Sequence, residues 1–141
     1  MNYNINMDNK TFRYQELLGL IGLVGSILTI ISEFLPWFSS TTLFGFYFIT
    51  IDIAIENAFL YLFPLMSGLI CLSGNILIII DDSHRTKFAI LDLFGLSFIL
   101  IFLLQIIPIH SFSFLFNYSG IYVFLAGLIL IILNLIDELI I

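Results

Sequence analysis

The sequence has few charged residues, and basic ones are the scarcest. Of its 141 residues, four are Lys or Arg and ten are Asp or Glu, which gives a formal net charge of −6. Charged residues make up 10% of the chain, against about 25% in an ordinary soluble domain. Four basic side chains are too few to follow a phosphate backbone, which excludes nucleic acid as a partner. Because 61% of the residues are hydrophobic, most of the surface must face lipid.

Groups typical of enzyme sites are also scarce. The single cysteine, Cys71, lies in an apolar run, has no second cysteine to pair with, and is interpreted as a small buried residue. Neither His84 nor His110 has a carboxylate or thiol at a spacing typical of a metal site or an activated nucleophile. No glycine-rich phosphate loop follows a strand. We therefore predict no catalytic residue, no metal ligand and no cofactor, and we do not expect an enzyme.

Four apolar segments approach the length needed to cross a bilayer. A helix that rises about 1.5 Å per residue needs about 20 residues to cross the hydrocarbon core. The segments are residues 17–38, 57–80, 88–109 and 120–136. The first lacks a small-residue cleavage site and is expected to be a membrane span, not a signal peptide. The predicted fold class is an all-α integral membrane protein: residues 1–16 form a cytoplasmic segment and residues 17–141 a single four-helix transmembrane domain.

The basic residues predict how these spans are oriented. Lys10 and Arg13 precede the first span, and Arg85 and Lys87 lie in the polar turn 81–87 between the second and third. The other two connections contain no Lys or Arg, and basic loops stay on the cytoplasmic side. We expect a multi-pass protein of the cell membrane with both termini in the cytoplasm.

The first outer connection has its own pattern. From Tyr47, apolar residues alternate in period two, which predicts a short β-hairpin over residues 38–52 with Gly45 in its turn. In a competing interpretation the second helix begins near Asp52 as an N-cap and absorbs the alternation. Pro64 is expected to kink the second span or to mark its first well-ordered turn.

Small residues recur at helical spacing within the spans. In lipid, helices associate where small residues allow the backbones to approach closely. These residues are Gly19, Gly22, Gly25 and Ser26 in the first span, Ser67, Cys71 and Asn75 in the second, Gly95 in the third, and Gly120, Ala126 and Gly127 in the fourth. They indicate either packing within the four-helix bundle or an oligomer interface.

Polar residues within spans are functional candidates because they are costly in lipid. Glu33 and Gln105 are expected near the outer face, where they form a possible pair. Asp92, Asn75 and Asn134 are expected nearer the cytoplasm, so the two groups differ in depth. Structural roles compete with a polar site: Asp92 is explained as a first-turn acid favoured by the helix dipole, and Glu33 as a group that reaches the outer interface.

The layout resembles the claudin-like tetraspan architecture. The resemblance rests on Phe34-Leu35-Pro36-Trp37-Phe38-Ser39 at the end of the first span, on Gly45-Phe46-Tyr47 in the outer loop, and on Gly120-Ile121-Tyr122 at the start of the fourth span. Claudins have two disulfide-forming cysteines in a longer first loop, so neither that disulfide nor a sealing role carries over. The chain is also similar to small prokaryotic four-span proteins whose first helix ends in Leu-Pro-Trp.

The predicted function is binding to other proteins and not catalysis. We expect a non-enzymatic structural or scaffolding protein that acts through lateral or outer-face contacts. Its partners are the lipid bilayer and either a second copy of the chain or another membrane protein. The candidate interaction surface is formed by Trp37, Phe44, Phe46 and Phe48. One alternative is a channel or transporter component that uses the intramembrane polar residues, and another is a membrane enzyme or an accessory subunit of one.

Overall fold

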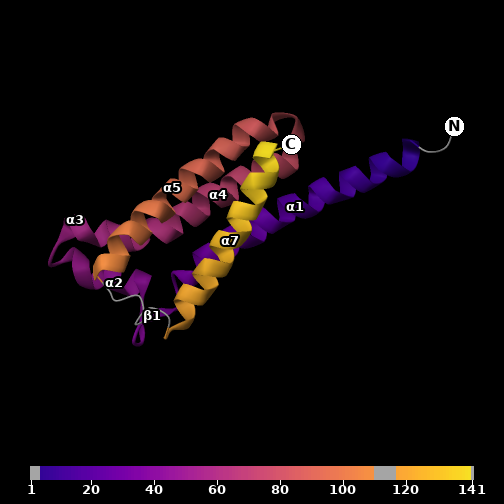
Figure 1. Ribbon diagram of the computed structural model, residues 1–141. Helices are drawn as coiled ribbons and strands as arrows, with labels where there is room; N and C mark the ends of the chain where they lie inside the picture. Colours follow the sequence, from indigo (N-terminus) through magenta and orange to yellow (C-terminus); the bar gives the residue numbers. More distant parts are fainter. Residues whose placement is uncertain (1–3, 110–116, 141) are drawn as a thin grey trace.

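The computed structural model describes residues 4–109 and 117–140, which are mostly helical. Its long helices are α1 (Asn4–Ser32), α4 (Phe63–Ile80), α5 (Arg85–Ile109) and α7 (Ser119–Ile140). α1 packs against α7 and α4, and α4 packs against α5. The turn between α4 and α5 and the end of α7 lie at one end of this bundle, where the beginning of α1 projects beyond it (Figure 1). The connection between α1 and α4 lies at the other end.

Within residues 4–109 and 117–140, three helices are long and apolar enough to cross a membrane. They are Ile55–Ile80 with 26 residues, Asp82–Pro108 with 27 and Ser119–Ile140 with 22. The apolar part of α1, Gly19–Ser32, is shorter. Large apolar side chains are exposed along the spans, as lipid-facing helices require. The predicted helical membrane architecture is confirmed at this level, and it is compatible with a multi-pass membrane protein.

The second of the predicted spans is a composite helix. It begins with α3 (Ile55–Ala58), continues through the 3₁₀ turn η1 (Phe59–Leu62) and becomes regular in α4. Pro64 lies in the first turn of α4, where its missing N–H leaves no helical bond unmade. It therefore marks the first well-ordered turn, which was one of the two expectations for this residue.

The first helix ends earlier than expected. α1 stops at Ser32, so the prediction of a helical span to residue 38 is wrong over residues 33–38. Pro36 supplies the reason, because proline lacks an N–H and disfavours helical backbone at the residue before it. The chain turns and forms β1 (Pro36–Phe38), which pairs antiparallel with β2 (Thr41–Thr42).

The hairpin is present but shorter and earlier than the one predicted over residues 38–52. Its turn includes Ser39, which has a φ of 57°. Thr42 then caps α2 (Leu43–Ile51), because its Oγ1 accepts a hydrogen bond from the Gly45 backbone N–H at 2.9 Å. Gly45 thus lies in a helix and not in the hairpin turn. Asp52 ends α2 and does not cap the second span, so the competing interpretation was wrong about the cap. It was right that the second span begins early, because that helix starts at Ile55 and has 26 residues.

The hydrophobic core is centred near the hairpin. Trp37 is fully buried there, with its ring edge-on to those of Phe102 and Phe124. Its Nε1 donates a 2.7 Å hydrogen bond to the Ser32 carbonyl at the end of α1. Gly120 makes room for the indole, since a Cβ at that position would overlap it. Trp37 was expected to form part of the candidate interaction surface, and its full burial shows that this part of the prediction was wrong.

Small residues of the long helices pack within the chain. A Cβ on Gly25 of α1 would lie 2.8 Å from the Gly127 carbonyl oxygen of α7, and one on Gly127 would lie 2.7 Å from the Gly25 carbonyl oxygen. Gly68 faces Ile30 in the same way, where a Cβ would lie 2.6 Å from Cγ1. Of the two interpretations of these residues, the contacts favour packing within the bundle.

Candidate functional site

Four polar side chains from three helices meet inside the bundle, towards the end that carries the α4–α5 turn. They are Asn75 of α4, Asp92 of α5, and Asn134 and Glu138 of α7, and none is more than 2% exposed. The Asn134 Nδ2 lies 2.8 Å from Asn75 Oδ1, 2.7 Å from Glu138 Oε1 and 3.4 Å from Asp92 Oδ2. We call these four residues the polar cluster.

Asn75 connects the polar cluster to the rest of α4 and to α1. Its Nδ2 donates to the Cys71 carbonyl at 2.8 Å and lies 3.2 Å from each carboxyl oxygen of Asp92. It is also 3.5 Å from the hydroxyl of Ser26 on α1. Gly22 of α1 completes the enclosure, because a Cβ there would overlap both amide side chains. All four long helices therefore take part.

The sequence identified most of this cluster but not its convergence. Asn75, Asp92 and Asn134 lie at similar depth, as expected, and they also touch one another. Glu138 was missed because the fourth span was expected to end at residue 136, whereas α7 continues to Ile140. The signal was available, since Glu138 lies four residues after Asn134 and therefore on the same helix face.

Asp92 does not have the role first considered for it. α5 begins at Arg85, so Asp92 lies about two turns into the helix and beyond the reach of a first-turn dipole effect. The Arg85 guanidinium bonds Asp137 at 3.0 Å, and Lys87 is exposed. The Asp92 carboxyl is instead held by the two asparagine amides of the polar cluster.

Glu33 and Gln105 do not form the expected pair. Glu33 follows the end of α1 and is fully buried, and neither carboxyl oxygen has a hydrogen-bond partner among the described residues. The Leu65 backbone amide in the first turn of α4 approaches this carboxyl group, without the geometry of a hydrogen bond. Gln105 is exposed on α5, beside the buried Ile106 that faces the core. The two side chains therefore lie in different environments.

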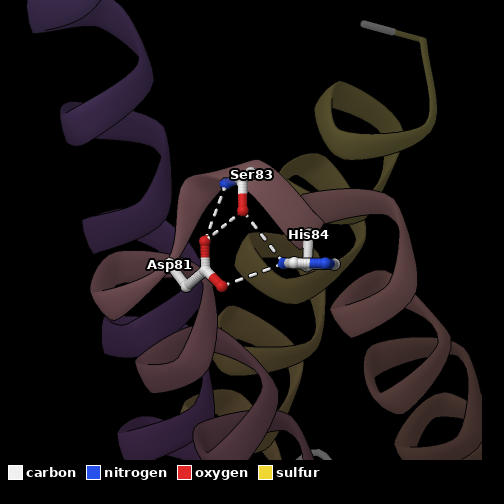
Figure 2. A network of polar contacts seen from close by, with 3 residues as sticks. All are labelled: Asp81, Ser83 and His84. Carbon is white, nitrogen blue, oxygen red and sulfur yellow. Dashed lines mark hydrogen bonds and ion pairs between the residues drawn. The ribbon is translucent and has the colours of Figure 1, made fainter.

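The polar turn between α4 and α5 brings an Asp, a Ser and a His together on the surface (Figure 2). The Asp81 carboxylate accepts hydrogen bonds from the Ser83 backbone and hydroxyl, and it lies 2.9 Å from Nδ1 of His84. These bonds, that from the Ser83 hydroxyl first and that from His84 next, lower the pKa of Asp81. Ser83 and Asp81 contact the same ring nitrogen, whereas a catalytic triad uses the two opposite ones. The arrangement caps a turn.

The aromatic residues of the outer connection divide into buried and exposed sets. Phe46 lies between the rings of Phe38 and Tyr61, with centroids 4.8 and 5.4 Å away, and belongs to the edge of the core. Phe44 is half-buried and packs against Phe48, which is 56% exposed. The exposed apolar residues of α2, α3 and their flanks, here called the outer apolar surface, are Phe48, Ile49, Ile53, Ile55 and Phe59.

The fold and the site define a structural class of protein, but no family or relative of the chain is found. Within residues 4–109 and 117–140, no group of three or more His, Cys, Asp or Glu side chains is placed to hold a metal ion. The class is a helical protein with three helices able to span a membrane and a buried polar cluster between them. No family model, curated protein or solved structure matches the chain.

Proposed function

We propose that the chain crosses the membrane four times, with α1 as the remaining span and both ends on the cytoplasmic side. α1 runs beside helices that are long enough to cross: Gly19 lies against Ile79 near one end of α4, and Ser32 meets Trp37 beside the start of α7. A helix that follows its neighbours over this distance crosses the same depth of lipid. The basic residues Arg85 and Lys87 support a cytoplasmic location for that end.

We further propose that the protein is a non-enzymatic structural protein of the membrane that binds another protein chain through the outer apolar surface. The observation that carries this proposal is the exposure of Ile53, which is 82%, next to the exposed acidic residues Asp52 and Glu56. The acidic side chains support a location of this segment at the boundary with water. Exposed apolar patches are typical of sites that contact another protein or a membrane, and we propose a protein here because these residues lie among acidic ones.

The packing inside the bundle also supports a contact role for the outer apolar surface. Close approach of Gly25 to Gly127, and of Gly68 to Ile30, uses the small residues for packing within the chain. These faces are no longer available for a lateral partner. The outer apolar surface remains available because α2 and α3 lie beyond the long helices at one end of the bundle (Figure 1).

Photo-crosslinking in native membranes tests this proposal. Benzoyl-phenylalanine replaces Phe48 in the outer apolar surface and, as the matched control, Phe94 on the lipid-facing side of α5. The two side chains are 56% and 58% exposed. We expect crosslinks to a protein chain from position 48, weakened by Ile53→Asp, and only lipid adducts from position 94. Lipid adducts alone at both positions would contradict a contact function, and the mass of the product distinguishes a second copy from another protein.

One observation favours the alternative of a channel or transporter component, namely the convergence of Asn75, Asp92 and Asn134. Against it, Gly22 leaves the two amides no free space towards α1. Ion flux into liposomes that contain the purified chain distinguishes the alternatives. A flux that Asp92→Asn abolishes would support transport, and we expect no flux above that of empty liposomes.

A further inference from the structure

The polar cluster has fewer hydrogen-bond donors than acceptors. The Asn134 amide nitrogen carries two hydrogens but lies within 3.4 Å of three acceptor oxygens, on Asn75, Asp92 and Glu138. The hydroxyl of Ser26 adds no donor, because it bonds the Gly22 carbonyl at 2.8 Å.

Two further acceptors of the polar cluster have no donor at all. Asn134 Oδ1 and Glu138 Oε2 are buried without a hydrogen-bond partner in the described chain. Both belong to side chains that point into the cluster with their other polar atom. Buried polar atoms normally have partners, so a donor in addition to the two amides is needed here.

The polar cluster also has an excess of negative charge when both acids are ionised. The charged groups that act on Glu138 are Arg85, Asp137 and Asp92, and the titratable groups that act on Asp92 are Glu138 and Cys71. Arg85 is the one cation among these described groups, and it bonds Asp137 at 3.0 Å. Arg85 also acts on Glu138 at longer range, but its buried Nε makes no hydrogen bond to any described residue. One cation therefore faces three carboxylates, those of Asp92, Asp137 and Glu138, and the excess negative charge is costly in an enclosed site.

We propose that the polar cluster is a proton-binding site in which Asp92 and Glu138 hold at least one proton between them. The reaction transfers a proton from hydronium to one carboxylate, which leaves water and a neutral carboxyl group without any redox change. The new O–H supplies the missing donor and cancels one negative charge. Glu138 is the member of the polar cluster nearest the end of α7, two residues before Ile140.

A proton fits this site better than a metal ion. The point where the acceptor oxygens of Asn75 and Glu138 converge is already filled by the Asn134 amide nitrogen, at 2.8 and 2.7 Å. A metal ion would require that amide to turn over and would need space beside Gly22, where even a Cβ overlaps the cluster. The inference does not depend on the proposed contact function, since it concerns the opposite end of the bundle.

Infrared spectroscopy of the purified full chain in nanodiscs tests the proposal, because the C=O stretch of a protonated carboxyl is separate from carboxylate bands. The measurement is made in a Glu33→Gln background, since Glu33 is a buried carboxyl outside the polar cluster. At pH 7 we expect an acid band that exchanges slowly in D₂O. Asp92→Asn combined with Glu138→Gln should remove it, and Asp82→Asn in the exposed turn should leave it unchanged.

Three outcomes would overturn the proposal. The first is the absence of an acid band at pH 7, and the second is a band that persists in the double variant. The third is loss of the band when Na⁺ or K⁺ replaces choline at constant pH and ionic strength, because a metal ion would then occupy the site. If the double variant fails to fold, each single variant is measured, and the band should shrink or shift in frequency in at least one; a band of unchanged size and frequency in both contradicts the proposal.

Discussion

Replacing Gly25 with alanine should push α1 and α7 apart. The added Cβ would lie 2.8 Å from the Gly127 carbonyl oxygen, 2.9 Å from the Leu130 Cβ and 3.0 Å from the Ile131 backbone nitrogen. These atoms belong to the backbone of α7 or are fixed to it, so no side-chain rotation relieves the contact. Ordinary contacts lie at about 3.5 Å, which means that the two helices must separate by roughly half an ångström.

The expected loss in the free energy of unfolding is worked out against a matched control on the same helix, Gly19→Ala. At Gly19 an added Cβ would meet its nearest atom, the Ile79 Cγ1, at an ordinary 3.7 Å. Both substitutions gain about 1 kcal/mol of helix propensity, so this contribution cancels in the comparison. Overpacking costs about 1–3 kcal/mol. Gly25→Ala should therefore have a free energy of unfolding about 2 kcal/mol below that of Gly19→Ala.

Reversible unfolding of the full chain in mixed micelles, followed by far-UV circular dichroism, measures this difference. A difference below about 0.5 kcal/mol would refute the close approach of α1 and α7. Gly127→Ala provides a second check, because it separates the same pair of helices. The double variant should lose less stability than the sum of the two single losses, since the second Cβ enters a space that the first has already opened.

Three other substitutions give separate predictions. Trp37→Phe removes the indole N–H that bonds the Ser32 carbonyl and should lower the free energy of unfolding by about 2 kcal/mol, measured in the same micelles. Arg85→Met leaves Asp137 without its ion pair and should cost about 1–2 kcal/mol; a double variant with Asp137→Asn should lose no more than the single one. The lowered pKa of Asp81 predicts that its contribution to stability is present above pH 3.8 and is lost as the pH falls through the folded-state value. Its carboxyl carbon should titrate below 3.8 by NMR, and nearer 3.8 in Ser83→Ala.

The long helices could be predicted because their signal is compositional. Segments of about 20 apolar residues have few alternatives to a helix in lipid. The polar residues 81–87 between two such segments accordingly indicated the turn between α4 and α5. The ends of helices depend instead on single residues: Pro36 stops α1 early, and Thr42 starts α2 where a periodic pattern had indicated a strand.

The candidate site was harder to predict because it depends on how the helices are aligned. Sequence placed Asn75, Asp92 and Asn134 at similar depth, but whether they face one another depends on the rotation of each helix about its axis. The burial of Trp37 likewise depends on Gly120, which is far away in the sequence and adjacent in space. The sequence pattern around an aromatic residue near a membrane boundary does not show whether its side chain faces lipid or the protein core.

The pairing of α1 with α7 has a consequence for how the protein is made. α1 is synthesised first among the long helices, and its closest backbone contact, between Gly25 and Gly127, forms with the one synthesised last. α4 and α5 are joined by a short turn and can pair as soon as both have entered the bilayer. α1 can pack against α4 at that stage, but the side of α1 that carries Gly25 stays uncovered until α7 enters the bilayer.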